Sequence, residues 1–234
     1  MARTKIIIAT VKSWNIENAL KFKNQFSENY DVEVISNQKD LSLREITRIS
    51  PSYIFFPHWS WIIPENIYKK YECIVFHMTD LPYGRGGTPL QNLILNKIYK
   101  TKVSAIKVEK GIDAGPIYLK KSFNIGRLSN AEEIYRRLSK VIFLEMIPYI
   151  LQYKPTPKKQ TGKIVTFIRR KPEESNILQS KISNLDDAYD FIRMLDAEGY
   201  PKVFIKKDKI KILFSDVNKL KNKLIGKYEI IYEK

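Results

Sequence analysis

Short apolar runs alternate with helical patterns through the first two thirds of the chain. Apolar runs of strand length occur at 5–10, 31–35, 53–56 and 73–76. Two further strand-like runs follow a helical pattern that Pro89 begins, and Pro is tolerated in a first helical turn. This alternation is typical of a doubly wound, mostly parallel sheet with helices on both faces. The helical patterns are 13–26, 41–49, 64–71 and 89–99, and the two later strand-like runs are 102–108 and 116–123.

The pattern changes in the last third of the chain. A helical pattern from 129 to about 151 leads into a polar, proline-containing segment at 153–163, which we interpret as an exposed linker or hairpin. Beyond Ile164 one helical pattern stands among several short strand-like runs. We therefore predict a domain over residues 1–165 and a small, mostly β C-terminal subdomain over residues 166–234.

One stretch near the middle combines a strand end with a flexible loop. The apolar run from Cys73 ends at His77, and Pro82, Gly84 and Gly86 lie in the loop that follows. Open α/β sheets bind their ligands at the carboxyl ends of their strands. His77 is therefore a candidate for the chemistry of the protein.

Two more polar residues follow other predicted strands. His58 comes just after the strand pattern at 53–56, and Asp113 lies in a turn between Gly111 and Gly115. Since neighbouring parallel strands end side by side, these residues can share one crevice with His77. A carboxylate beside an imidazole forms an acid/base pair, which suits acyl transfer to an amine through a tetrahedral oxyanion.

Composition narrows the class of protein. The chain has 41 Lys and Arg against 25 Asp and Glu, a formal charge of +16. Such a charge attracts polyanions, but the basic residues are spread over the whole sequence, so we interpret them as a solvated surface and do not expect a nucleic-acid partner. One cysteine, no apolar run of membrane-spanning length and no signal peptide favour a cytoplasmic protein without a membrane partner.

Several common sites are not predicted. Two histidines and one cysteine do not provide the usual metal-ligand spacing. The first strand is not followed by Gly-x-Gly-x-x-Gly, and no phosphate-binding Walker sequence occurs. We therefore expect neither a metal nor a dinucleotide.

Two motifs together resemble the folate-dependent formyltransferases. The run from His77 to Pro89, His-Met-Thr-Asp-Leu-Pro-Tyr-Gly-Arg-Gly-Gly-Thr-Pro, resembles the family signature His-x-Ser-x-Leu-Pro-x-x-Arg-Gly-x-x-Pro. The run from Gly111 to Gly115, Gly-Ile-Asp-Ala-Gly, is similar to the second motif, Gly-Leu-Asp-Thr-Gly, and lies at a fitting distance. The resemblance covers residues 1 to about 175 and implies the Rossmann-like formyltransferase fold.

The resemblance also implies a role for each matching residue. The formyl donor is N10-formyltetrahydrofolate, with His77 stabilising the oxyanion and Asp113 orienting His77 and helping to remove the amine proton. For Arg85, Arg169 and Arg193 a structural role is the alternative to a substrate contact, and for His58 simple packing is the alternative. The residues implied to bind the folate are Phe56, Pro57, His58, Trp59, Gly111 and Ile112, and those implied to bind the substrate are Thr79, Arg85, Arg169 and Arg193.

One residue departs from the family pattern. The family has an asparagine two residues before the histidine, where this chain has Val75. That asparagine would donate a hydrogen bond to the formyl oxygen, a contact that stabilises the transition state. We expect another donor to replace it; otherwise the enzyme is slow or inactive. The candidate donors are His58, Thr79, Asn92 and a backbone N–H.

The segments 167–175, 188–193 and 199–201 resemble the part that follows the catalytic domain in sugar-nucleotide formyltransferases. Our leading hypothesis is therefore formyl transfer to a nucleotide-linked 4-amino-4,6-dideoxy sugar by a homodimer. The sequence does not specify the sugar or the base. The alternatives are a methionyl-tRNA formyltransferase, for which the C-terminal part is short, and a non-catalytic homologue that binds folate or nucleotide.

Overall fold

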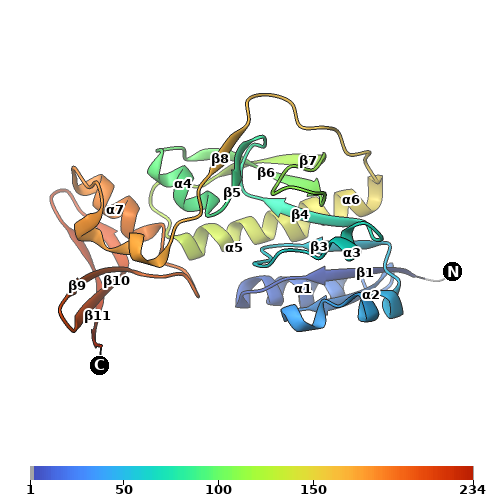
Figure 1. Ribbon diagram of the computed structural model, residues 1–234, viewed down its shortest axis with the longest axis horizontal. Coiled ribbons are helices and arrows are strands. Elements are labelled where there is room, and N and C mark those ends of the chain that lie inside the picture. The colour runs from blue at the N-terminus through green and yellow to red at the C-terminus, as the bar shows by residue number, and fades with distance from the viewer. Residues whose placement is uncertain (1–2, 234) are drawn as a thin grey trace. The chain divides into compact units, whose positions relative to one another are not determined.

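The computed structural model describes residues 3–233 and divides into two compact units (Figure 1). The first unit contains Met1–Arg85, Lys102–Phe123 and Arg136–Thr166. The second contains Gly86–Thr101, Asn124–Tyr135 and Phe167–Lys234. In the part of the chain that the structure describes, no helix is long and apolar enough to cross a membrane.

A six-stranded sheet forms the centre of the first unit. Strands β1 to β4 run parallel to one another, and β6 runs antiparallel to β4. The prediction of a mostly parallel α/β fold with a small C-terminal β sheet is confirmed. In spatial order the strands are β2 (Tyr30–Ile35), β1 (Thr4–Ala9), β3 (Tyr53–Phe56), β4 (Cys73–His77), β6 (Lys100–Lys107) and β7 (Ile117–Asn124).

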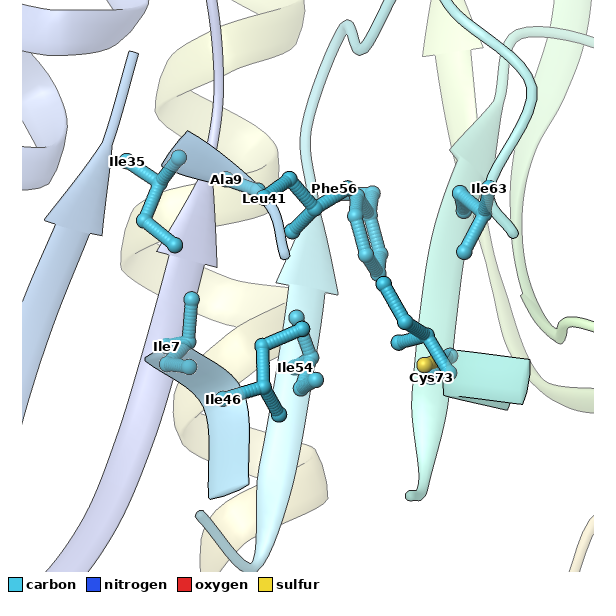
Figure 2. Close-up of a cluster of buried hydrophobic side chains, with 10 residues drawn as sticks. Ile7, Ala9, Ile35, Leu41, Ile46, Ile54, Phe56, Ile63 and Cys73 are labelled. Atoms are coloured by element: carbon cyan, nitrogen blue, oxygen red, sulfur yellow. The ribbon is translucent and has the colours of Figure 1, made fainter. Parts of the chain in front are cut away.

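Helices cover both faces of this sheet. The chain moves from β1 outward to β2 and then back across β1 to β3, so right-handed connections put α1 (Ser13–Gln25) and α2 (Leu43–Ile49) on opposite faces. The α2 face carries a cluster of buried apolar side chains (Figure 2). α3 (Glu65–Tyr68) adds Ile67 to this cluster. A short 3-10 turn, η1 (Gln38–Asp40), precedes α2.

The predicted helix from 129 to about 151 is one long helical segment with a wider turn inside it. It consists of α5 (Ala131–Val141), a π-helical turn (Ile142–Met146) and α6 (Ile147–Tyr153). Pro148 lies at the start of α6. Because proline has no N–H and its ring crowds the preceding turn, a wider turn before Pro148 relieves the conflict that a regular α-helix would have there.

The sequence patterns missed a small two-stranded sheet. β5 (Tyr83–Gly86) lies in the glycine-rich loop and pairs with β8 (Val165–Phe167), which follows the predicted linker. The Val165 N–H donates to the Pro82 carbonyl at 3.2 Å. Neither strand has a long apolar run, and each pairs with a partner about 80 residues away. The local sequence pattern therefore gave no sign of this sheet.

The second unit joins α4 (Pro89–Leu95) to the C-terminal part of the chain. α4 packs against α7 (Leu185–Arg193), and the Gln91 side chain donates to the Met194 carbonyl at 2.9 Å. The predicted domain limit near residue 165 stays a prediction. The other elements of this unit are η3 (Pro172–Ser175), η4 (Ile177–Gln179) and the antiparallel strands β9 (Val203–Lys207), β10 (Ile210–Lys219) and β11 (Leu224–Tyr232).

Candidate active site

His77 is the last residue of β4 and faces two acceptors. Its side chain is buried, with 8% of the residue exposed. The ring atom Nε2 lies 2.7 Å from the carbonyl oxygen of Gly84, and Nδ1 lies 3.4 Å from Oδ2 of Asp113. A carbonyl oxygen only accepts, so Nε2 carries a hydrogen. Only a ring with hydrogens on both nitrogens directs an N–H toward both acceptors at once.

Asp113 belongs to the turn between β6 and β7. The turn is tight: Asp113 has φ +50° and Gly111 has φ +102°. At Gly115 the backbone passes so near the Lys107 carbonyl oxygen that a Cβ would lie 1.8 Å from it. The two glycines therefore allow a turn that carries the Asp113 carboxylate to the ring of His77.

The loop after β4 is held by its own hydrogen bonds. Thr79 is fully buried, and its hydroxyl donates to the Gly84 carbonyl at 3.3 Å. Ser104 of β6 donates to the Thr79 carbonyl at 2.7 Å. Thr79 thus has a structural position beside His77, and its predicted substrate contact stays a prediction.

Arg85 points to a residue that the sequence patterns did not single out. Its Nε and Nη2 donate to Oε1 of Gln160 at 3.1 and 2.8 Å. The Gln160 amide nitrogen in turn donates to the carbonyl oxygens of Asp113 and Gly115, both at 2.8 Å. These contacts correspond to the structural alternative for Arg85 rather than to a substrate contact. Nothing in the polar segment 153–163 marks Gln160 as different from its neighbours.

The last residue of β3 and the loop that follows it carry four of the residues predicted to bind folate. Phe56 is 1% exposed and packs in the core cluster (Figure 2), so only its backbone is available to a ligand. The Pro57 carbonyl accepts from the hydroxyl of Thr10 at 2.6 Å. The ring of Trp59 packs edge-on against Phe56 and also against Trp61, with centroid distances of 5.9 and 4.8 Å. The side chains of this loop therefore fix its backbone.

His58 lies in the same loop in a strained conformation. It has φ +54°, and its ring packs edge-on against Trp14 at 6.0 Å. Burial, and then the charge of Lys12, lower the pKa of His58 to about 4. His58 is therefore neutral at neutral pH, and its ring can donate one hydrogen bond and accept another.

Exposed apolar side chains occur in both loops that the resemblance assigns to folate. Ile112, next to Asp113, is 67% exposed. Trp61 and Ile62, which follow the β3 loop, are 38% and 81% exposed.

The remaining predicted substrate residues belong to the second unit. Arg169 is exposed. Arg193 is fully buried, and it donates to Asp190 Oδ1 and to the Ser129 carbonyl, both at 2.7 Å. The guanidinium of Arg193 is thus engaged inside this unit, which favours the structural alternative.

Two candidates for replacing the missing asparagine are already engaged. The Asn92 amide donates to Gly87 and Thr88 carbonyl oxygens, and Thr79 is buried in its loop. Cys73 is not a nucleophile, because burial raises the pKa of its thiol to about 12. The replacement of the asparagine by His58 or by a backbone N–H stays a prediction.

Comparison with known proteins identifies the family. A solved structure described as methionyl-tRNA formyltransferase from Clostridium thermocellum is 51% identical, with a TM-score of 0.94 over 98% of this chain and 99% of that one. The chain belongs to the formyltransferase family. The model of the methionyl-tRNA formyltransferase C-terminal domain matches residues 172–231.

More distant relatives extend the comparison. A methionyl-tRNA formyltransferase from Campylobacter jejuni is 29% identical over 173 residues, which is 73% of this chain and 55% of that protein. The chain thus spans about half the length of the curated relatives it matches. HypX from Aquifex aeolicus, solved in complex with tetrahydrofolic acid, shares the fold at 15% identity, with a TM-score of 0.74 over 92% of this chain and 38% of that one.

The sugar-nucleotide hypothesis is wrong. It depended on the segment after residue 166, yet the family model that matches 172–231 describes a methionyl-tRNA formyltransferase domain. The short C-terminal part is no argument against a tRNA enzyme either, because the Clostridium chain is covered almost completely. Our expectation of an amino-sugar partner and of no nucleic-acid partner is contradicted by the same matches. The error arose because evenly spread lysines do not distinguish a solvated surface from one that attracts a polyanion.

Proposed function

We propose that this protein is a methionyl-tRNA formyltransferase that uses N10-formyltetrahydrofolate as its formyl donor. The observation that carries the proposal is the His77–Asp113 pair, with 3.4 Å between Nδ1 and Oδ2, in a chain 51% identical to a protein of that name. The acceptor is the primary amine of the methionine esterified to tRNA. An imidazole–carboxylate pair provides the groups that transfer to such an amine requires.

The reaction proceeds in two steps. The amine nitrogen attacks the formyl carbon, and the carbonyl oxygen becomes an oxyanion that His77 stabilises. Asp113 helps to remove the proton that the new N–C bond makes acidic. The bond between the formyl carbon and N10 then breaks, N10 takes up a proton, and the carbonyl reforms as the formyl amide.

The loops after β3 and β6 suit a flat folate ring. The exposed side chain of Ile112 offers apolar contact beside Asp113. The Trp59 Nε1 is buried and has no hydrogen-bond partner in the described part of the chain, so a bound ligand can provide its acceptor. We assign the backbone of Phe56–Trp59 and the Gly111–Ile112 turn to folate as part of this proposal.

The charge of the chain fits a tRNA substrate. A surplus of 16 positive charges attracts a polyanion at long range. Binding of basic side chains to phosphates releases the counterions that surround the nucleic acid. Because this release is less favourable at higher salt, such binding weakens steeply as the salt concentration rises. We assign the reaction to the cytoplasm, where aminoacylated tRNA is available.

The test is formylation of methionyl-tRNA by the purified chain with N10-formyltetrahydrofolate, with the formyl-methionine product measured after release from tRNA. Uncharged tRNA is the matched control, since it lacks the amine but keeps every phosphate. The proposal requires product only from the charged tRNA. Folate binding without product would instead support the non-catalytic alternative that Val75 permits.

The homodimer expected from the sequence stays a prediction. In the second unit the outer strand of the antiparallel sheet, β11, is exposed along most of its length. An exposed edge strand can pair with another strand. Sedimentation of the purified chain over a range of concentrations measures whether it self-associates.

A further inference from the structure

Gln160 makes four hydrogen bonds within the candidate active site. The Arg85 guanidinium occupies the amide oxygen with two N–H groups, at 3.1 and 2.8 Å. The amide nitrogen donates both of its hydrogens to carbonyl oxygens of one turn, those of Asp113 and Gly115. Because Arg85 only donates, the amide cannot turn round without facing donor to donor. Arg85 therefore fixes which way Gln160 points.

The turn that Gln160 contacts is one that needs support. Asp113 has φ +50°, a conformation that residues other than glycine seldom adopt and that costs free energy. Such a conformation persists only where neighbouring contacts hold it. The two hydrogen bonds from Gln160 reach the carbonyl groups on either side of Ala114, and they hold the turn from outside.

Consecutive residues of β5 thus hold both members of the acid/base pair. The Gly84 carbonyl accepts from Nε2 of His77 at 2.7 Å and fixes the imidazole. The next residue, Arg85, fixes Gln160, which in turn fixes the backbone of Asp113. The distance between the two catalytic side chains is therefore set through one short strand.

We propose that Gln160, oriented by Arg85, is a positioning residue that keeps the Asp113 carboxylate at the His77 ring. This inference rests on the proposed function for its effect on rate. It gives Arg85 a role through Gln160 rather than on the substrate. A one-ångström displacement of a catalytic group can cost about 100-fold in rate, so the loss of this contact has a measurable consequence.

Three substitutions separate the parts of the contact. Gln160→Met keeps the length of the side chain but removes all four hydrogen bonds. Gln160→Glu keeps the acceptor for Arg85 but removes both donors and turns a negative oxygen toward two carbonyl groups. Arg85→Met leaves Gln160 in place without its orientation. Gln152→Met is the matched control, because Gln152 is an exposed glutamine of α6 in the same unit.

We expect kcat to fall about 10- to 100-fold in Gln160→Met and Gln160→Glu. The KM for methionyl-tRNA should change less than about threefold, because Gln160 holds the turn that carries Asp113 and is not assigned to the tRNA. The KM for folate is not a criterion, because Gly111 and Ile112 of the same turn are assigned to folate. The double variant Arg85→Met/Gln160→Met should be no slower than Gln160→Met alone, since the two residues act as one unit. Wild-type kcat in Gln160→Met would overturn the inference while leaving the proposed function intact.

A second measurement is independent of activity. The chain has only two histidines, so the ring N–H signals of His77 can be assigned in nitrogen-15 spectra with the His77→Ala variant. The Nδ1 proton of His77 should exchange with water at least about tenfold faster in Gln160→Met and in Asp113→Asn than in the wild type. Gln152→Met should leave the rate unchanged. Equal rates in Gln160→Met and wild type would overturn the inference even if the chain formylates no tRNA.

Discussion

The Nδ1 atom of His77 lies 3.4 Å from Oδ2 of Asp113, and the two residues come from the end of β4 and from the turn that follows β6. The other ring nitrogen, Nε2, is hydrogen-bonded to the Gly84 carbonyl oxygen. The imidazole is therefore held on both sides, and its protonated form is the one that satisfies both neighbours. In the proposed reaction the oxyanion forms beside this ring, which is already held in place before the amine attacks.

Replacing the carboxylate while keeping its shape should remove most of the activity. We expect Asp113→Asn to lower kcat by at least about 100-fold, because the amide cannot take up the amine proton. His77→Ala should lose at least as much, and the double variant should be no worse than the poorer single one. Single-turnover formylation of methionyl-tRNA measures this effect. Asp31→Asn, an exposed aspartate of β2, is the control, and equal rates in all four variants would falsify the catalytic assignment.

Restoring the asparagine that the family has before its histidine should increase the rate. Val75 and His77 are two residues apart on β4, so their side chains lie on the same face of the sheet. Val75→Asn should raise kcat by up to about tenfold if the formyl oxygen lacks a donor. It should also destabilise the free protein by about 1–2 kcal/mol, because Val75 packs against the apolar cluster and an amide there lacks partners.

Val75→Thr is the control for that experiment. Threonine has about the volume of valine and adds a polar hydroxyl, but its side chain is too short to reach the formyl oxygen as an asparagine amide would. Steady-state kinetics and urea unfolding provide the two measurements. A stable Val75→Asn variant with unchanged or lower kcat would mean that a donor elsewhere, such as His58 or a backbone N–H, already serves the formyl oxygen.

The main elements could be predicted because their signals are local. The run Ile6–Ala9 is completely buried, and a strand buried on both faces is a continuous apolar run in the sequence. β5 and β8 were missed because their pairing joins segments about 80 residues apart, and because β5 contains two glycines and β8 has only three residues. The π-helical turn was missed because Pro148 shows only that a regular α-helix is unfavourable at this point. It does not show whether the helix ends, bends or widens there.

The candidate site shows the same division. The structure brings His77 and Asp113 together, as expected, but the expected reason was wrong. Because β6 runs antiparallel to β4, the carboxyl ends of these two strands do not lie side by side, and Asp113 reaches His77 from the turn between β6 and β7. Gln160 could not be predicted, because its position depends on a polar segment that pairs with the start of β7 through Lys158 and Ile117, and Gln160 itself lies 47 residues after Asp113. The acceptor was predicted wrongly because motifs around His77 and Asp113 report the transfer chemistry, whereas the acceptor is recognised by other surfaces.

Breaking the buried ion pair of the second unit should be strongly destabilising. Asp190 accepts from the buried Arg193 at 2.7 Å and from Lys97 and Tyr99 at 3.0 and 2.6 Å. We expect Asp190→Asn to lower the free energy of unfolding by about 3 kcal/mol, because a buried guanidinium loses its counter-charge. Lys21→Met is the control: it removes an ion pair to Glu17 with a lysine side chain that is 68% exposed, and it should change the stability by less than about 1 kcal/mol. Urea unfolding compares the two variants, and similar small effects would contradict the structural role of Arg193.

His58 should make the stability of the protein depend on pH. The pKa of His58 is lowered to about 4 in the folded chain, and an unfolded histidine has its ordinary value of about 6.5. Between these values the unfolded chain binds a proton that the folded chain does not, so the free energy of unfolding falls as pH decreases through this window. The loss should reach at most about 3 kcal/mol near pH 4, and it should be absent above pH 7. His58→Asn keeps a small polar side chain without titrating, so unfolding measured from pH 4 to 7 should show a smaller pH dependence in this variant. The same slope in both proteins would mean that other groups, and not His58, take up the protons.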